Sequence, residues 1–349
     1  MNNNDIKYMK LALKLAKKGE GKVSPNPQVG CVIVKNNKII ATGYHKFFGG
    51  LHAEIDALEK CKNPKDATMY VNLEPCCHYN KKTPPCVPQI IDAGIKRVVV
   101  AMKDSNSLVY GKGIKQLRNK GIKVEVGILE KEAKRLNETY MKFITKKIPF
   151  VILKLAFSVD GKTKTIAEDS KWISSESSRN IVYKLRSATD AILVGSNTVL
   201  VDNPSLTSHG MGKNPVRVIL DANLEIPSHS NVLNNEAETV IATSKNADKN
   251  KKTKLINMGI KILELPSKKG FVDLKKLLIE LAKLNILSVV VEGGETVAQE
   301  FFRKRLVDKI VFFICPKIID GEKYIKDAMI VKNVSIRKIE NDLLYEGYL

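Results

Sequence analysis

The chain has 349 residues, with 58 Lys and Arg against 37 Asp and Glu, and a formal net charge of +21. Its length exceeds the roughly 250–300 residues at which a single hydrophobic core stops growing, so it predicts two domains. No apolar run approaches the ~18–20 residues that span a membrane. The polar start, Met1-Asn-Asn-Asn-Asp-Ile-Lys, lacks an apolar signal core. We therefore expect a cytoplasmic protein without a membrane partner.

The positive charge invites a nucleic-acid interpretation, because a basic surface attracts phosphate backbones regardless of sequence. Only nine of the 58 basic residues are Arg, however, and the lysines are spread along the chain rather than gathered in one arm. This pattern is typical of a compositional bias toward Lys, Asn and Ile. We expect no nucleic-acid partner.

Periodicity in the first half predicts helices that alternate with strands. Apolar residues recur at three- and four-residue spacing in the helices, and β-branched runs mark the strands. We expect helices over 5–18, 52–61, 87–93, 113–121 and 129–144, and strands over 29–34, 39–44, 68–73, 97–102 and 122–126. The alternation favours a three-layer α/β/α domain that ends near Lys147.

The second half repeats the alternation after the short polar segment Lys146-Lys-Ile-Pro149. Strands are expected over 150–157, 191–195, 216–220, 239–242, 260–263, 286–291 and 307–314, and helices over 177–187, 273–284 and 296–304. We therefore predict a domain boundary at residue 147, with domains over 1–147 and 148–349, and an α/β fold class for both.

A cluster of metal-ligating residue types is the strongest chemical signal. His52-Ala53-Glu54 begins a predicted helix, and Pro75-Cys76-Cys77 and Cys86 follow the next strand. One imidazole and two thiolates leave a fourth tetrahedral position on zinc open for water, which ionises near neutral pH. Glu54 is placed to take the proton from that water and pass it to the substrate. This His-x-Glu and Pro-Cys signature is that of zinc nucleobase deaminases.

The cysteines need to be distinguished from one another. Ten positions separate Cys76 from Cys86, whereas many deaminases have Cys-x-x-Cys. Adjacent cysteines rarely both reach one tetrahedral ion, so we prefer Cys76, which directly follows the proline, and interpret Cys77 as a small neighbour. Cys31, Cys61 and Cys315 lie in apolar or helical contexts and are expected to pack in the core.

The sequence resembles a known family, the bifunctional riboflavin biosynthesis enzymes that fuse a pyrimidine deaminase to a reductase. In the first half the resemblance rests on 25–32 (Pro-Asn-Pro-Gln-Val-Gly-Cys-Val), 43–45 (Gly-Tyr-His), His52-Ala-Glu, 73–76 (Leu-Glu-Pro-Cys) and 83–86 (Thr-Pro-Pro-Cys). It implies a cytidine deaminase-like fold and a substrate pocket lined by Asn26, His45, His78 and Lys82. The loop before Thr83 is one residue longer than usual, which leaves Lys81 and Lys82 both open as the contact.

The second half resembles the family's reductase, which has a dihydrofolate reductase-like fold. The resemblance rests on 153–163, 170–174, 195–207 and the Val-Glu-Gly-Gly-Glu-Thr run at 291–296, where a strand enters a glycine turn and a helix. Such a turn presents backbone N–H groups to phosphate. The resemblance implies that NADPH contacts Ala156, Trp172, Thr198, Asp202, Gly293, Gly294, Glu295 and Thr296.

The same resemblance implies that the reductase substrate contacts Ser170, Arg186, Leu206 and Glu292. We expect Arg186 to clamp a phosphate, because a guanidinium binds oxyanions in bidentate geometry. The family usually has an Arg shortly after Leu206-Thr207, where this chain has Ser208-His209. Compensation by His209, by Arg217 or by a nearby Lys stays open.

The predicted function is therefore bifunctional, with zinc and NADPH as cofactors. Zinc hydroxide deaminates 2,5-diamino-6-(5-phosphoribosylamino)pyrimidin-4(3H)-one, and NADPH then reduces the ribosyl group to ribityl. The partner is a small phosphorylated pyrimidine, and a homo-oligomer is expected from the family. The main alternative is a tRNA or other nucleic-acid base deaminase with an accessory domain, which leaves the reductase-like half unexplained. A second alternative is a non-catalytic module that zinc stabilises.

Overall fold

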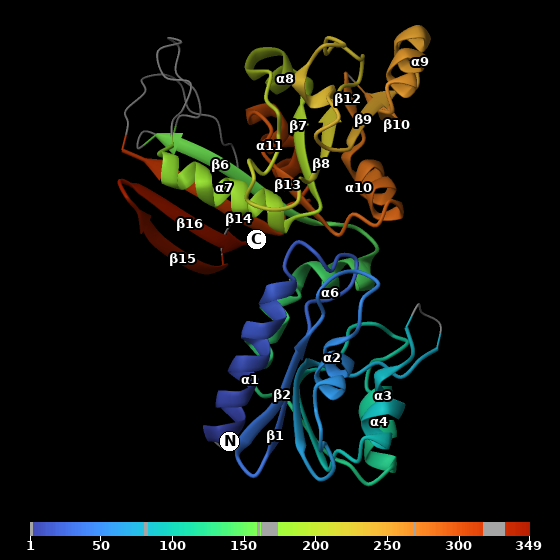
Figure 1. Cartoon of the computed structure of the whole chain (residues 1–349). Coiled ribbons are helices and arrows are strands. Elements are labelled where there is room, and N and C mark those ends of the chain that lie inside the picture. Colours follow the sequence, from blue (N-terminus) through green and yellow to red (C-terminus); the bar gives the residue numbers. More distant parts are fainter. Residues whose placement is uncertain (1–2, 80–82, 159–160, 162–173, 269, 317–331) are drawn as a thin grey trace. The chain divides into compact units, whose positions relative to one another are not determined.

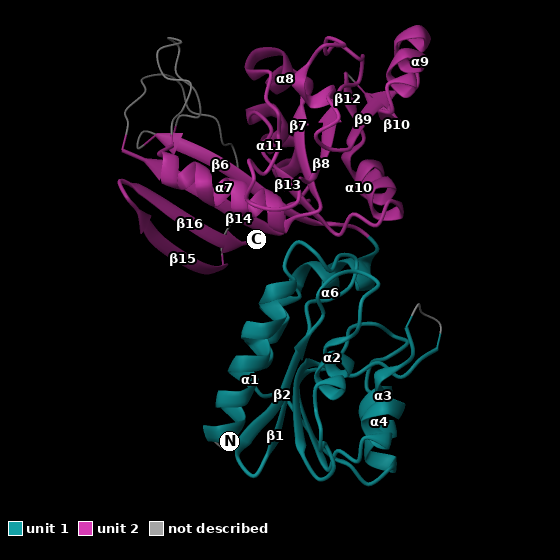
Figure 2. Ribbon diagram, viewed as in Figure 1, with its two compact units in different colours: residues 1–147 teal, residues 148–349 magenta. Residues whose placement is uncertain are grey.

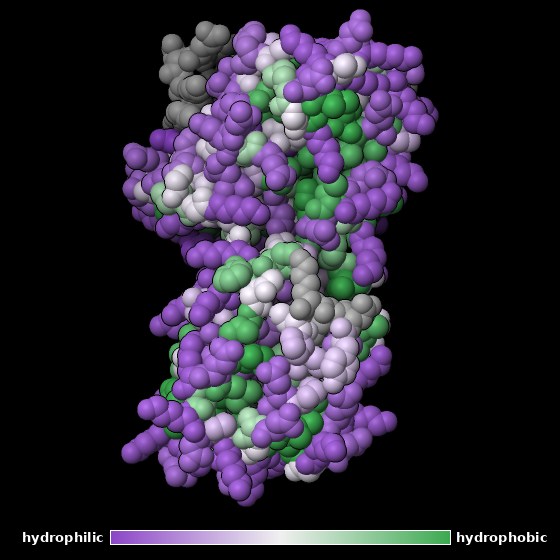
Figure 3. All heavy atoms as spheres, turned by 45° about the vertical axis from the view of Figure 1, so that its right-hand side comes forward, coloured by the Kyte–Doolittle hydropathy of each residue, from purple (hydrophilic) through white to green (hydrophobic). Residues whose placement is uncertain are grey.

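The structure is a computed structural model that describes residues 3–79, 83–158, 161, 174–268, 270–316 and 332–349. The chain divides into two compact units, Met1–Lys147 and Ile148–Leu349 (Figure 2). Hydrophilic side chains are spread over the visible surface of each unit (Figure 3). None of the helices in the described part of the chain has the length and apolar character that a membrane crossing requires.

The first unit is built on a five-stranded sheet in the order β2-β1-β3-β4-β5. β1 pairs antiparallel with β2 and β3, whereas β3, β4 and β5 run parallel. The strands are β1 Gly30–Lys35, β2 Lys38–Tyr44, β3 Thr68–Leu73, β4 Arg97–Met102 and β5 Lys123–Val126. The helices are α1 Asn3–Ala16, the 3-10 turn η1 Lys17–Gly19, α2 Ala53–Glu59, α3 Cys86–Asp92, α4 Lys112–Asn119, α5 Glu130–Leu136 and α6 Glu138–Lys146.

Two glycines show that helices cover both faces of this sheet. A Cβ on Gly30 would lie 2.1 Å from the backbone oxygen of Ala12 in α1, and one on Gly43 would lie 2.3 Å from that of Ala53 in α2. Gly43 pairs with Cys31, the residue after Gly30, so the two glycines face opposite sides. The predicted three-layer α/β/α arrangement is confirmed, with α1 and α2 on either side of β1 (Figure 1).

The single long helix predicted over 129–144 is wrong, because the structure has two helices that meet at Asn137. The backbone of Asn137 leaves the helical region at φ −109° and ψ 21°. Its buried side chain accepts a hydrogen bond from the Gln28 N–H at 2.8 Å and donates to the Gln28 carbonyl at 3.0 Å. An apolar periodicity does not reveal a break that is held by a backbone segment more than a hundred residues away.

The second unit is built on a nine-stranded sheet in the order β10-β9-β8-β7-β13-β6-β14-β16-β15. The strands from β10 to β14 run parallel, and β16 and β15 continue the sheet antiparallel. The strands are β6 Phe150–Ser158, β7 Ala191–Gly195, β8 Val216–Leu220, β9 Thr239–Ser244, β10 Lys261–Leu265, β13 Ser288–Val291, β14 Lys309–Cys315, β15 Lys332–Ile339 and β16 Asp342–Tyr348. A separate two-stranded ribbon is formed by β11 Ser267–Lys268 and β12 Phe271–Val272.

Helices again pack on both faces. Their bounds are α7 Glu176–Ala188, α8 Ser196–Asp202, the 3-10 turn η2 Asn231–Leu233, α9 Lys249–Asn257, α10 Leu274–Lys283 and α11 Glu295–Arg303. Alternate residues of β6 enter different clusters: Leu153 packs with α10 and α11, and Ile152 packs with Val182 of α7. The elements α8, α9, β15 and β16 were not predicted, because they are short or lack a clear apolar period.

The hydrogen bonds between Asn137 and Gln28 generate a testable prediction. Asn137→Ala leaves the Gln28 N–H without its side-chain acceptor, while the Gln28 carbonyl keeps the Asn72 amide as a donor at 3.0 Å. The Gln28 N–H is part-buried, and an unsatisfied donor costs at most about 1–3 kcal/mol. Urea unfolding should show a loss of that size. Asn119→Ala on the exposed side of α4 is the control and should change little. Equal losses in both variants would contradict this role.

Candidate functional site

Three metal-ligating side chains converge in the first unit. His52 immediately precedes α2, Cys76 follows the end of β3, and Cys86 is the first residue of α3. Nδ1 of His52 lies 3.4 Å from Sγ of Cys76 and 3.3 Å from Sγ of Cys86, and the two sulfurs lie 3.4 Å apart. These ligand atoms all lie within 4.8 Å of one another.

The donor set fits zinc. Tetrahedral zinc bound at about 2.3 Å from sulfur and about 2.0–2.1 Å from nitrogen separates its donors by about 3.5–3.8 Å. The observed separations of 3.3–3.4 Å are slightly shorter. Within the described residues, the group holds no fourth His, Cys, Asp or Glu donor. Three protein donors with an open fourth position are the arrangement of a catalytic zinc site.

Cys77 lies outside this group. Its thiol is buried and points to the backbone oxygen of Leu108, with Sγ at 4.0 Å. Burial raises the pKa of this thiol, and the nearby carboxylate of Glu74 raises it further. The structure therefore brings Cys76, and not its neighbour, to His52. Cys31, Cys61 and Cys315 are buried in the cores, as predicted.

Glu54 lies beside the donor group in the first turn of α2 and is only 3% exposed. Burial raises the pKa of its carboxyl, and the thiolate of Cys76 acts in the same direction, whereas His52 lowers it. A carboxyl with this environment and this position can exchange a proton with a molecule held at the open metal position.

Asn26 and His45 lie side by side next to His52. Nδ2 of Asn26 is 3.0 Å from Nε2 of His45, and Nδ1 of His45 is 2.8 Å from the Leu51 carbonyl. The carbonyl is an acceptor only, so Nδ1 carries the proton and Nε2 accepts from Asn26. Burial lowers the pKa of His45, which favours this neutral form. The His45 ring meets the His52 ring edge-on, with 5.5 Å between centroids.

Of the two residues predicted in the loop before Thr83, only His78 is described. Nδ1 of His78 is buried and has no hydrogen-bond partner among the described residues. A buried ring nitrogen without a partner is costly unless a ligand satisfies it, which fits a substrate contact. Lys82, and Lys81 as the alternative, lie outside the described residues.

Glu74 is a positioning residue that the sequence reasoning missed. Its side chain is 2% exposed, and its carboxylate accepts hydrogen bonds from three backbone N–H groups, those of Gly111 at 2.9 Å and of Asp104 and Ile114 at 3.2 Å. It thereby ties the segment 104–114 to the chain that carries Cys76. The sequence signal for this role was an acidic residue directly after a buried strand. A buried carboxylate needs several hydrogen-bond donors, so such a residue indicates that backbone N–H groups gather around it.

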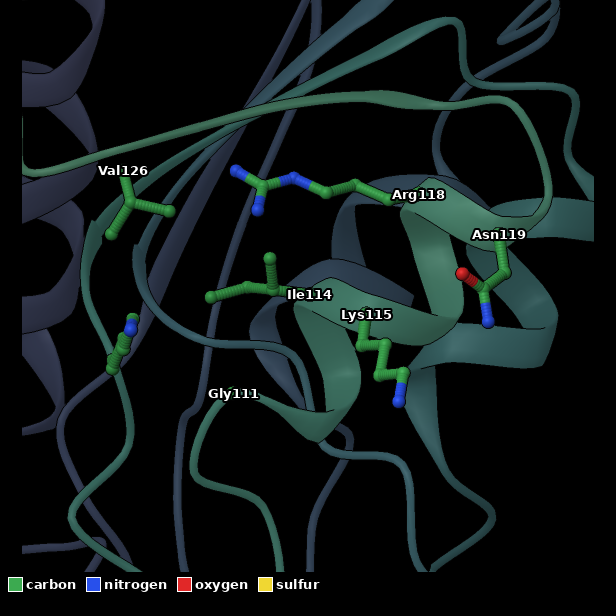
Figure 4. A pocket seen from close by; sticks show the side chains of 7 residues that line it. Gly111, Ile114, Lys115, Arg118, Asn119 and Val126 are labelled. Atoms are coloured by element: carbon green, nitrogen blue, oxygen red, sulfur yellow. The ribbon is translucent and has the colours of Figure 1, made fainter.

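The cavity in Figure 4 is separate from the metal-ligating side chains. It has a volume of about 340 Å³ and lies between α4 and β5, where Arg118 and Ile114 extend toward Val126. Lys103 and Lys115 also line it. None of the metal-ligating side chains contributes to it.

In the second unit a buried charge cluster follows β13. Nε and Nη2 of Arg186 donate to the two oxygens of Glu292 at 2.9 and 3.0 Å, and Nζ of Lys154 lies 3.6 Å from Glu292. Burial alone would raise the pKa of Glu292, but the two cations lower it to about 2. In this structure the bidentate face of Arg186 is directed at Glu292, and its contact with a phosphate stays a prediction. Lys154 lies in the 153–163 run that carries the resemblance, but its pairing with Glu292 was not predicted.

The structure also shows where His209 and Arg217 lie, the two named candidates to compensate for the missing family Arg. Arg217 is fully buried and donates to Thr239 Oγ1 and to backbone oxygens of the 205–237 region, including that of Ala237, so it holds loops together. The His209 ring instead packs on the Tyr183 ring, with 4.1 Å between centroids. The guanidinium of Arg186 lies over the same Tyr183 ring, 5.6 Å from its centroid. Of the two named candidates, only His209 lies beside Arg186.

The residues predicted to contact the cofactor gather where parallel strands end. Gly293 and Gly294 join β13 to α11, and a Cβ on Gly294 would lie 3.7 Å from Oγ1 of Thr198 in the neighbouring α8. Glu295 and Thr296 begin α11, and Ala156 lies in β6. Asp202 ends α8, and Leu206 is buried with a left-handed φ of 53°.

Ser170 and Trp172 lie outside the described residues, so two of the predicted contacts have no structural account. Of the described ones, Ala156 lies near the carboxyl end of β6, Thr198 lies in the helix after β7, and residues 293–296 follow β13, and these three strands are adjacent in the sheet. Ligands of open α/β sheets bind at this edge.

Comparisons with known proteins match both halves of the chain. The cytidine and deoxycytidylate deaminase zinc-binding region matches residues 2–102, and the RibD C-terminal domain matches residues 149–345. The riboflavin biosynthesis protein RibD of Aquifex aeolicus is 46% identical over 343 residues, covering 97% of this chain and 93% of its own. This chain belongs to the RibD family. The RibD protein of Escherichia coli is 36% identical over 334 residues, covering 91% of this chain and 89% of its own.

Solved RibD structures agree. A Thermotoga maritima structure described as a diaminohydroxyphosphoribosylaminopyrimidine deaminase/5-amino-6-(5-phosphoribosylamino)uracil reductase superposes with a TM-score of 0.87 at 37% identity, covering 99% of this chain and 98% of that one. The Acinetobacter baumannii RibD structure gives 0.88 at 33% identity, with the same coverage. The chain is therefore a bifunctional riboflavin biosynthesis enzyme with a zinc-binding deaminase domain and a reductase domain, which implies a nicotinamide cofactor. A nucleic-acid base deaminase is not favoured, since it does not explain residues 149–345.

The placement of the two adjacent thiols predicts different outcomes for their removal. Cys76→Ser should reduce bound zinc to well below one equivalent, because it removes one of the three donors that converge. Cys77→Ser should keep one equivalent, because its thiol lies outside the donor group. Metal analysis of the purified chains measures both. Loss of zinc in the Cys77 variant with retention in the Cys76 variant would reverse the assignment.

The buried ion pair of the second unit predicts a pH-dependent stability. Glu292→Gln leaves Arg186 buried without its charge partner, which costs about 3–5 kcal/mol at pH 7. The pKa of Glu292 is lowered from 4.5 to about 2, so its stabilisation is complete above pH 4.5 and is lost as the pH falls toward 2. The difference between wild type and variant should shrink by about 1.4 kcal/mol per pH unit in that window.

Urea unfolding at pH 7 and pH 3.5 measures the difference. Glu300→Gln is the matched control, because its partner Arg303 is 70% exposed, and exposed pairs contribute about 0–1 kcal/mol. A Glu292 variant that behaves like the Glu300 variant would contradict the assignment.

Proposed function

We propose that residues 1–147 deaminate 2,5-diamino-6-(5-phosphoribosylamino)pyrimidin-4(3H)-one and that residues 148–349 reduce the ribosyl group of the product with NADPH. The observation that carries the first half is the convergence of His52, Cys76 and Cys86 beside the buried Glu54. The family supplies the substrate: the Thermotoga relative is described as a deaminase and reductase of these compounds.

His52, Cys76 and Cys86 hold the zinc ion in this proposal. When bound, zinc supplies an open coordination position and lowers the pKa of water there toward neutrality. Glu54 would accept one proton of the water held there and pass it to a ring nitrogen of the pyrimidine. It would then take the remaining proton from the oxygen added to the ring carbon and hand it to the amine, which leaves as ammonia. Because Glu54 is only 3% exposed, bulk water does not compete for this proton.

Asn26, His45, His78 and Lys82 bind the pyrimidine phosphate. Asn26 keeps its side-chain oxygen and a second N–H for the pyrimidine edge after donating to His45, and an amide reads both donors and acceptors. The unpaired Nδ1 of His78 meets a polar group of the substrate. A lysine of the 80–82 loop, Lys82 or its neighbour Lys81, neutralises the phosphate.

NADPH binds at the carboxyl ends of the parallel strands in the second unit. The backbone N–H groups at the start of α11, those of Glu295 and Thr296 after Gly293 and Gly294, donate to its phosphates. The Thr198 hydroxyl lies beside them and also contacts the cofactor. Ala156, Trp172 and Asp202 complete the contacts. The lack of a Cβ at Gly294 lets the cofactor approach beside Thr198.

The substrate of the reductase binds at Ser170, Arg186, Leu206 and Glu292. Arg186 directs two N–H groups at Glu292 and one at the Thr207 carbonyl, so we assign it to orienting the carboxylate. Glu292 stays ionised between Arg186 and Lys154 and accepts hydrogen bonds only, which suits the hydroxyls of a ribosyl group rather than a phosphate. A cytoplasmic location and a homo-oligomeric state belong to the same proposal and rest on the family.

Glu54→Gln tests the proposal. The variant keeps the size of the side chain but removes its proton acceptor, so ammonia release should fall by at least 10²–10⁴-fold. Bound zinc and NADPH oxidation with the deaminated substrate should stay at wild-type levels, which is the internal control. Deamination at an undiminished rate would exclude Glu54 as the proton carrier.

A further inference from the structure

Both nitrogens of the His52 ring have partners in one short segment of the chain. Nδ1 lies 3.3 Å from Sγ of Cys86, and Nε2 lies 3.2 Å from Oγ1 of Thr83. Thr83 and Cys86 are the two ends of Thr83-Pro-Pro-Cys86. The imidazole therefore lies between a thiol on one side and a hydroxyl on the other, both from the same four residues.

The two prolines make this segment stiff. A proline ring restricts φ to about −65° and also restricts the residue before it to extended conformations. Pro85 has φ −65° and ψ 147°, and α3 begins directly after it. The Cys86 N–H is further fixed by a hydrogen bond to the Cys76 carbonyl at 3.0 Å. The distance between the Thr83 hydroxyl and the Cys86 thiol is thus set by backbone that cannot easily relax.

The tautomer of His52 follows from these contacts. A neutral imidazole carries one N–H, and a ring nitrogen binds a metal only through its lone pair. With Nδ1 directed at the two thiols, the proton must be on Nε2, where the Thr83 hydroxyl can accept it. The opposite tautomer would place the N–H at the metal position and leave the Thr83 hydroxyl to donate.

We propose that Thr83 is a positioning residue that fixes the tautomer and ring orientation of His52 for zinc, through a hydrogen bond from Nε2–H to Oγ1. This rests on the assignment of His52, Cys76 and Cys86 as the zinc ligands. The ring is held on a second side by His45, which meets it edge-on. His52 precedes α2 but makes no side-chain cap hydrogen bond to it, so its orientation is not set by the helix.

Two substitutions separate the hydroxyl from the shape of the side chain. Thr83→Val keeps the branched shape and removes the acceptor, whereas Thr83→Ser keeps the acceptor. Loss of such a hydrogen-bond partner weakens metal affinity by about 10–100-fold. We expect that loss for the Val variant and a change of less than about threefold for the Ser variant. The measurement is competition for zinc between the full chain and a chromophoric chelator.

Thr145→Val is the matched control, since among the described residues the Thr145 hydroxyl bonds within α6, to the Met141 carbonyl at 2.7 Å and the Lys142 carbonyl at 3.3 Å. The zinc affinity of this variant should equal that of wild type. A Val variant with wild-type zinc affinity would overturn the role of Thr83 and leave the zinc site intact. A wild-type chain that binds no zinc would instead overturn the site itself.

Nitrogen-15 NMR of the zinc-loaded wild-type chain decides the question without a variant, including the case in which Thr83→Val does not fold. The proposal predicts a His52 ring with its proton on Nε2, bonded to an oxygen acceptor. A proton on Nδ1, or an Nε2–H in free exchange with solvent, would overturn the proposal.

Discussion

The approach of the His52 imidazole to the thiols of Cys76 and Cys86 is the contact on which the first unit's chemistry depends. The three donors come from the start of α2, the end of β3 and the start of α3, within 4.8 Å of one another. Backbone groups at helix ends have no partner within the helix. Where such ends meet the ends of strands, side chains from different elements, such as these three donors, can lie close together. Glu74 adds a further tie by binding the backbone of segment 104–114.

In the second unit, an ion pair rather than a set of metal ligands holds side chains together at the strand ends. Its parallel strands end beside a buried carboxylate, Glu292, which two cations keep ionised. Burying a charge is costly, and only a close, hydrogen-bonded partner offsets the cost. Arg186 provides it through two hydrogen bonds to Glu292, and that geometry leaves the carboxylate as the acceptor at the strand ends. Because a buried Glu292 carboxylate needs a charged partner, Arg186 is held in a hydrogen-bonded ion pair with it.

The sequence was sufficient for the features that local patterns encode. Most strands and most helices followed from the apolar period, and His52, Cys76 and Cys86 followed from their residue types and spacing. Long-range partners were not predictable in this way. Asn137 divides a predicted helix because it bonds to Gln28, and Arg186 pairs with Glu292 from a distant strand end. Glu74 and Lys154 lie inside runs that carry the family resemblance, but their roles were missed because those roles depend on partners distant in the sequence. A periodic pattern reports which face is buried, not which polar groups meet there.

The central claim is that one chain performs two reactions at separate sites, and the direct test is to follow ammonia and NADPH separately in the zinc-loaded wild-type chain. With the pyrimidine phosphate as substrate, ammonia should appear whether or not NADPH is present, and NADPH should be oxidised only after deamination. A strong chelator should stop ammonia release and spare NADPH oxidation with the deaminated product. Absence of ammonia from the zinc-loaded chain, or NADPH oxidation that fails with the deaminated product, would contradict the account.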